Sequence, residues 1–285
     1  MASMRDIKRR RNSIQSTQQI TKAMKLVSTV KLQRSKQHAL DARDYFSYMY
    51  ETVQSMLERT GSIIHPYITP SDCKKKAVIM ITGNRGLAGG YNNNVVKMIT
   101  HGDLKKEDLL IYTIGSKGRE AMARYGYELA EDYSGMIEEP EYTDAMRLAT
   151  ILLQAFKEGK IGEIYLVYTH FKNTVVHEPV LMKLLPVETK ERKDSDGKNQ
   201  VPMNFEPQEQ EALDLIIPKY VTSIIYGGMV ESLASENGAR MQAMDSATSN
   251  AEDLIDKLSL QYNRERQGSI TQELTEIIAG ANAIS

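Results

Sequence analysis

Cysteine and tryptophan are the residues that this sequence has least of. The chain has 285 residues with no tryptophan and a single cysteine, Cys73. One cysteine excludes an internal disulfide, a cysteine-rich zinc site and a dithiol switch within the chain. The five histidines are scattered, and none forms a close pair with metal-ligand spacing. The sequence therefore predicts no metal site and no resident cofactor.

Long apolar runs are also missing. No run of about 18 apolar residues occurs, so no segment is predicted to span a membrane. The N-terminal stretch MASMRDIKRRRNSIQ lacks the apolar core of a signal peptide. It is as basic as a mitochondrial transit peptide, but it contains Asp6 and runs directly into a helical pattern. We therefore expect a cytoplasmic bacterial protein.

Proline is absent from both ends of the chain. The eight prolines all lie between Pro66 and Pro218. Because proline inside a helix costs roughly 3 kcal/mol, the proline-free ends are suited to long helices. At about 1.5 Å per residue, each end is long enough for a rod of up to about 100 Å.

Apolar residues at both ends recur with helical spacing. Near the N-terminus the positions are Ile20, Ala23, Met24 and Val27, and a stripe of the same kind begins the C-terminal end. Further along that end the steps alternate three and four residues, which is typical of a coiled-coil seam. This seam comprises Met241, Met244, Thr248, Ala251, Ile255, Leu258 and Tyr262.

Charge separates the two ends. Residues 1–40 hold ten Lys and Arg against one acid, whereas residues 206–285 hold thirteen Asp and Glu against five Lys and Arg. Two such helices are able to pair antiparallel, with a modest contribution from exposed charges. The alternative is two separate amphipathic helices packed on a globular core. The ends are several times longer than the usual helix of about 12 residues, which favours the coiled coil.

The middle of the chain changes to strand patterns alternating with helices. Strands are predicted at 75–83, 108–115 and 163–171, with a fourth returning at 174–187, and helices at 116–126 and 143–159. This alternation predicts an α/β layer with a mostly parallel sheet. We therefore expect a Rossmann-like α/β domain inserted into a long antiparallel coiled coil. The predicted boundaries are 1–65 for the first shaft helix, 66–207 for the domain and 208–285 for the second shaft helix.

A glycine-rich turn, TGNRGLAGGYN at residues 82–92, follows the first predicted strand. A strand, a glycine turn and a helix together are typical of phosphate binding. However, no lysine follows the glycines as in a Walker loop, and the spacing from Gly83 to Gly90 does not match the dinucleotide fingerprint. A tight turn that packs a helix on the sheet is therefore favoured over a nucleotide site. Its asparagines would then contact a neighbouring subunit or pack the domain.

No catalytic motif accompanies the turn. The sequence has no G-x-S-x-G, no H-E-x-x-H and no evident Cys/His pair. The basic run Lys8–Arg11 is compatible with nucleic-acid binding, but the first 44 residues lack aromatics that would stack on bases. A basic helix that faces an acidic protein partner explains the run equally well.

The C-terminal stretch SITQELTEIIAGANA, residues 269–283, has an apolar face that ends in small residues. The face comprises Ile270, Leu274, Ile277, Ile278 and Ala281. Chain ends usually fray and turn polar. An apolar tip indicates insertion into a sleeve that another chain provides.

Several segments together resemble one family. The pattern from Ile270 to Ala283 is similar to the terminal motif of the gamma subunit of rotary, F-type ATP synthases. TQQITKAMKLVSTVKL at 17–32 resembles that family's N-terminal helix, and GNRGLAGGYN resembles its glycine segment. FEP at 205–207 and YNRERQGSITQEL at 262–274 match as well, so the resemblance, of bacterial type, spans the whole chain.

The resemblance implies a central shaft without catalytic residues of its own. The two terminal helices would turn inside a hexamer of alpha and beta subunits, and the α/β domain would lie near the epsilon subunit and the membrane ring of c subunits. Proton flow would turn the ring and the shaft, which drives the beta sites through the conformations that make ATP. One copy per complex, peripheral on the cytoplasmic face of the cell membrane, is implied, with no nucleic acid.

The resemblance also implies site residues. Contacts with beta would come from Arg9, Arg10, Lys22, Met24, Lys25, Arg266 and Gln267. The apolar tip from Ile270 onward would turn in a bearing, and Phe205 and Glu206 would lie near the c ring. Relatives often carry Asp at the position of Asn84 and Cys at the position of Ala88, so the roles of those two side chains do not transfer. A nucleotide-binding α/β enzyme that uses Gly83–Gly90, and a coiled-coil nucleic-acid binder, are the alternatives.

Overall fold

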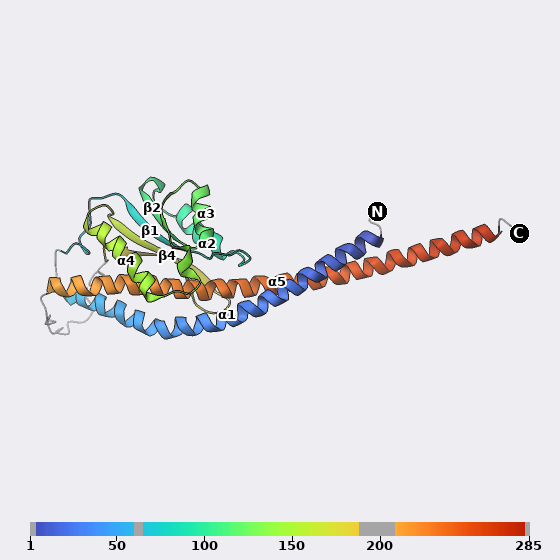
Figure 1. Cartoon of the computed structure of the whole chain (residues 1–285), viewed down its shortest axis with the longest axis horizontal. Coiled ribbons are helices and arrows are strands. Elements are labelled where there is room, and N and C mark those ends of the chain that lie inside the picture. The colour runs from blue at the N-terminus through green and yellow to red at the C-terminus, as the bar shows by residue number, and fades with distance from the viewer. Residues whose placement is uncertain (1–3, 60–64, 188–208, 283–285) are drawn as a thin grey trace, which may run out of the picture. The chain divides into compact units, whose positions relative to one another are not determined.

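The computed structural model describes residues 4–59, 65–187 and 209–282. It divides the chain into two compact units, Met1–Ser28 with Arg240–Ser285, and Thr29–Ala239. Two long helices, α1 (Met4–Arg59) and α5 (Glu209–Asn282), run through both units and contain 56 and 74 residues (Figure 1). The prediction of two long terminal helices is confirmed.

Helix α5 begins before the last proline of the chain and includes Pro218. The missing N–H of proline removes one backbone hydrogen bond, and the helix continues past it. Among the described residues, α5 is the one helix with a stretch long and apolar enough, by length and composition alone, to cross a membrane, and 61% of that stretch is buried inside the fold. Such burial is typical of a helix that belongs to a core.

In the first unit, α1 and α5 pair as an antiparallel coiled coil. Gln18 contacts Glu252 at 3.0 Å and Lys25 contacts Asp245 at 2.5 Å, so the partner numbers fall as the α1 numbers rise. The predicted α5 seam is confirmed. Met244, Thr248, Ala251 and Leu258 are buried, while Met241, Ile255 and Tyr262 are half-buried.

The packed face of α1 is not the apolar stripe of the sequence. Ile20 and Val27 are 60% and 58% exposed, whereas Thr21 and Ser28 are buried. The hydroxyls of Thr21 and Thr248 hydrogen-bond across the seam at 2.8 Å. Small hydroxyl side chains let the two backbones approach closely and satisfy their own polar groups, so the apolar spacing identifies the helix but not the face that packs.

The second unit contains a five-stranded sheet in the order β3-β2-β1-β4-β5. The first four strands are parallel and β5 is antiparallel to β4. The strands are β1 (Lys76–Ile81), β2 (Leu109–Ile114), β3 (Glu128–Asp132), β4 (Glu163–Phe171) and β5 (His177–Leu185). All four predicted strands and the mostly parallel sheet are confirmed. The structure also contains β3, which was not predicted because its sequence, ELAED, is short, acidic and without an apolar run.

Helices cover both faces of the sheet. The side chains of β1 point alternately to the two faces and so belong to two separate cores. Ile79 and Ile81 pack in one core with α4 and with residues of α1 and α5, while Val78 and Met80 pack in the other core with α2 and α3. The helices are α2 (Tyr91–Thr100), α3 (Ser116–Arg124) and α4 (Tyr142–Lys157), with short 3-10 turns at Lys106–Asp108 and Ser134–Ile137. The sheet is therefore the middle of three layers (Figure 1).

Candidate functional site

The glycine turn connects β1 to α2 and lies at the carboxyl ends of the parallel strands. In open α/β sheets this edge is where ligands usually bind. A phosphate would need free backbone N–H groups there, most readily at the start of a helix. The hydrogen bonds around the turn therefore decide whether it is a phosphate cradle.

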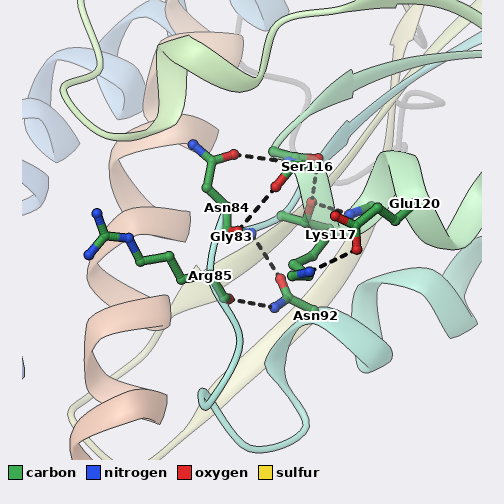
Figure 2. Close-up of polar contacts among 10 residues, drawn as sticks. Gly83, Asn84, Arg85, Asn92, Ser116, Lys117 and Glu120 are labelled. Carbon is green, nitrogen blue, oxygen red and sulfur yellow. Dashed lines mark hydrogen bonds and ion pairs between the residues drawn. The ribbon is translucent and has the colours of Figure 1, made fainter. Parts of the chain in front are cut away.

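The first N–H groups of α3, next to the turn, already have partners. Ser116 N donates to Asn84 Oδ1 at 2.9 Å, and Lys117 N donates to the Gly83 carbonyl at 3.1 Å. Gly118 N donates to Thr82 Oγ1 at 2.9 Å. Figure 2 shows the amide of Asn84 turned toward Ser116. These three N–H groups at the start of α3 are therefore occupied by the chain itself.

Asparagine side chains also close the turn from within. Gly83 N donates to Asn92 Oδ1 at 2.9 Å, and Asn92 Nδ2 donates to the Arg85 carbonyl at 3.3 Å (Figure 2). Asn84 Nδ2 donates to the carbonyl of Ser134 at 2.8 Å. Asn84 and Asn92 are thus internal braces, while Asn93 and Asn94 are exposed.

Basic side chains of the turn region are engaged elsewhere. Lys117 pairs with Glu120 at 2.7 Å, and its hydrogen bond and charge lower the pKa of that carboxyl. Arg85 is exposed, lies 4.0 Å from Glu138 and points away from Ser116 and Asn92 in Figure 2. Neither cation is directed at a position where a phosphate would lie against the turn.

Close packing explains one glycine of the turn, Gly83, and the glycine before α3, Gly115. Gly115 has φ of +110°, and an added Cβ would overlap the carbonyl of Thr82. At Gly83 an added Cβ would lie 2.5 Å from the carboxylate of Glu236, a buried residue of α5. The turn therefore joins β1, α3 and α5 at short distances, which supports the interpretation of a packing turn. Its outer tip is Leu87, which is 63% exposed and has φ of +62°.

The predicted basic contacts lie along one stretch of α1. Arg9, Arg10 and Lys22 are exposed, and Met24 and Lys25 are half-buried. Arg9 pairs with Asp6 at 3.3 Å on the same helix, and Lys25 pairs with Asp245. All five residues therefore lie on one helix, and most of their charged groups face solvent.

The predicted contacts on α5 are also exposed. Arg266 and Gln267 face solvent, and the tip residues Ile270, Leu274, Ile277 and Ile278 are 48%, 54%, 67% and 59% exposed. Ala281 is exposed as well. Phe205 and Glu206 lie outside the described residues.

Sequence reasoning missed one surface. Ile20, Leu26 and Val27 form an exposed apolar stretch of α1 beside the basic residues. The helical spacing of Ile20 and Val27 predicted a packed stripe, but the residues directly after them, Thr21 and Ser28, are the buried ones.

Comparison with known proteins gives one consistent result. A family model described as ATP synthase matches residues 3–284. The chain is 60% identical over 291 residues to an ATP synthase gamma chain of Lachnoclostridium phytofermentans, covering 100% of both chains. It is 41% identical over 299 residues to a sodium ion specific ATP synthase gamma chain of Acetobacterium woodii, covering 99% of each.

Solved structures agree at the level of the fold. A chain in the rotor of the Euglena gracilis mitochondrial ATP synthase superposes with a TM-score of 0.69 at 17% identity, covering 94% of this chain and 98% of that one. A chain in the central stalk and c ring of the Tetrahymena thermophila mitochondrial enzyme gives 0.59 at 23% identity, covering 80% and 99%.

Proposed function

Because the chain belongs to the ATP synthase gamma-chain family, we propose that it is the central rotor shaft of an ATP synthase. The observation that carries the proposal is 60% identity to a gamma chain over the full length of both proteins. The shaft transmits torque between the membrane c ring and the alpha/beta hexamer. It couples ion translocation to ATP synthesis or hydrolysis. We keep the division into a first shaft helix (1–65), a domain (66–207) and a second shaft helix (208–285) as part of this proposal.

The exposed charge on α1 supports contact with acidic segments of beta. Arg10 and Lys22 face solvent, and together with Arg9, Met24 and Lys25 they present a basic surface on a rigid helix. A shaft that turns past several like partners cannot use one deep complementary interface. Diffuse charge attracts a partner over a distance of about 8–10 Å without fixing one orientation.

The end of α5 supports an apolar bearing. From Asn263 to Asn282 its residues are exposed, apart from the half-buried Glu265 and Ser269. Most of the stability of a helix in a protein comes from the packing of its apolar face, so a surrounding partner would stabilise this segment. Four large apolar side chains on one face, with Ala281 beyond them, fit a smooth sleeve better than they fit water. We expect the exposed residues Arg266 and Gln267, just before the tip, to contact beta.

The remaining partners follow from the same proposal. The domain contacts the epsilon subunit and the c ring, with Phe205 and Glu206 near the ring. One copy per complex is peripheral on the cytoplasmic face of the bacterial cell membrane. We expect protons as the coupling ion, although a relative that is 41% identical is named for sodium.

We further propose that this subunit of the ATPase complex has no catalytic residues and no cofactor of its own. The alternative is a nucleotide-binding enzyme that uses Gly83–Gly90. The hydrogen bonds that Asn84, Asn92 and Thr82 accept oppose it, because they engage the backbone N–H groups of Ser116, Gly83 and Gly118.

Calorimetry with ATP and the purified chain distinguishes the rotor subunit from the nucleotide-binding enzyme. The N–H groups of Gly83, Ser116 and Gly118 are engaged within the chain, so we expect no heat of binding at micromolar ATP and no hydrolysis. The same chain should form a stable complex when mixed with alpha and beta subunits. Micromolar ATP binding by the chain alone, together with failure to form that complex, would favour the enzyme.

A further inference from the structure

Strand β4 extends beyond β1, the strand that pairs with one of its two edges. β1 pairs with β4 only from Glu163 to Val167, whereas β5 pairs with β4 as far as Phe171. The last residues of β4 therefore have no neighbouring strand on the β1 side. Buried backbone N–H and C=O groups need a partner, because leaving one unpaired costs about 1–3 kcal/mol.

Helix α5 supplies these partners through its side chains. Thr169 N donates to Ser232 Oγ at 3.2 Å, and Ser235 Oγ donates to the Thr169 carbonyl at 3.3 Å. Phe171 N donates to Glu231 Oε2 at 3.4 Å. Thr169 and Phe171 are two residues apart, so their backbone groups face the same edge of the strand. The helix thus takes the place of the missing strand.

The contacts are buried and reinforced. Ser232 and Ser235 are completely buried, and Thr169 is 2% exposed, so water does not compete for these hydrogen bonds. Glu231 also bonds Nδ1 of His170 at 2.6 Å. The hydroxyl of Tyr91, on α2, donates to the Ser232 carbonyl at 3.1 Å and ties a second element to the same turn of α5.

Glycines let the helix lie close to the sheet on either side of this point. An added Cβ at Gly228 would lie 3.1 Å from Leu166 and 3.3 Å from Ile81. At Gly238 it would lie 2.7 Å from the ring of His177. The side chains of Glu231, Ser232 and Ser235 therefore reach β4 at a place where the backbones are held near each other.

We propose that Glu231, Ser232 and Ser235 form a polar clamp that fixes α5 to the edge of β4 and transmits torque between the α/β domain and the shaft helix. Apolar packing is non-directional and opposes sliding only weakly, whereas hydrogen bonds need their geometry. The three side chains are positioning residues for coupling. The proposal rests on the proposed rotor function.

The first test uses the assembled membrane complex, with ATP hydrolysis and ATP-driven ion pumping measured on the same preparation. The variants are Glu231→Ala and the double change Ser232→Ala with Ser235→Ala. Ser223→Ala is the matched control, because Ser223 is also completely buried on α5 but its hydroxyl bonds the Lys219 carbonyl of the same helix. We expect the clamp variants to keep hydrolysis and to lose pumping severalfold, with the control unchanged.

Three results have distinct meanings. An unchanged ratio of pumping to hydrolysis in the clamp variants overturns the clamp. A proportional loss of both activities also overturns it, because that pattern reports assembly or stability and not torque transfer. If the wild-type complex fails to pump, it is the rotor function that is wrong.

A second test does not depend on rotation. Hydrogen exchange of the purified chain should show faster exchange of the Thr169 and Phe171 amides in the clamp variants than in the wild type and in Ser223→Ala. Because these amides donate to Ser232 and Glu231, unchanged protection in the clamp variants would contradict the proposal even if coupling were affected.

Discussion

Gly115→Ala is expected to lower the free energy of unfolding of the α/β domain by about 3 kcal/mol or more. Gly115 has φ of +110°, a conformation that strains any other residue, and a Cβ there would overlap the Thr82 carbonyl. That carbonyl belongs to a backbone held in place by the hydrogen bond from Thr82 N to the Ile114 carbonyl, 2.7 Å long. The neighbouring strand cannot move away without breaking this bond.

Urea unfolding followed by tyrosine fluorescence measures the effect, because the chain has fifteen tyrosines and no tryptophan. Gly86→Ala is the matched control, since no atom lies within 4 Å of an added Cβ there. We expect the control to change stability by less than about 1 kcal/mol. Equal effects at the two glycines would show that the turn is not closed by the contacts described.

Truncation after Tyr262 is expected to leave the α/β domain folded and to reduce coupled ATP synthesis by roughly tenfold or more, equivalent to about 1.4 kcal/mol. Beyond Tyr262 most residues of α5 are exposed, so their removal deletes little buried surface. It does remove Arg266, Gln267 and the apolar tip that begins at Ile270. Urea unfolding of the chain and ATP synthesis by the reconstituted complex measure the two effects.

Single substitutions refine this test. Ile277→Asp places a charge on the exposed apolar face, whereas Gln272→Asp places the same charge on the opposite face of the helix. We expect only Ile277→Asp to weaken coupling, because a carboxylate in an apolar bearing is costly. A truncated chain that failed to fold would show that the tip belongs to the core and would contradict the bearing.

Most of the architecture could be predicted from local patterns. The seam from Met241 to Tyr262 follows from its three- and four-residue steps, and buried strands such as β1 are recognisable as apolar runs bounded by turn residues. These features depend on side chains that pack by hydrophobicity, which the sequence displays directly.

Features that depend on backbone geometry were not predictable. The packed face of α1 includes Thr21 and Ser28, whose hydroxyls are typical of exposed positions in a sequence. The structure shows that Thr21 is buried and that its hydroxyl bonds that of Thr248. Strand β3 is held by pairing with β2 and not by apolar content. The role of Ser232 and Ser235 becomes evident only when the structure shows that β1 stops pairing with β4 before β4 ends.

The residues proposed to contact partners form a third class. Arg10, Lys22 and the tip residue Ile270 are exposed, as a contact surface requires, but the geometry of one chain does not identify the partner. Their assignment depends on the family resemblance, whereas the closed turn at Gly83 and Asn84 is decided by hydrogen bonds within the chain.

Rotation of this chain inside the hexamer tests the central claim most directly. Cys73, the only cysteine, lies half-buried before β1 and is a site for attaching a visible probe to the α/β domain. With the hexamer held on a surface through its beta subunits, ATP should turn the probe continuously in one direction. A probe that stays fixed while the same complexes hydrolyse ATP would contradict the rotor account.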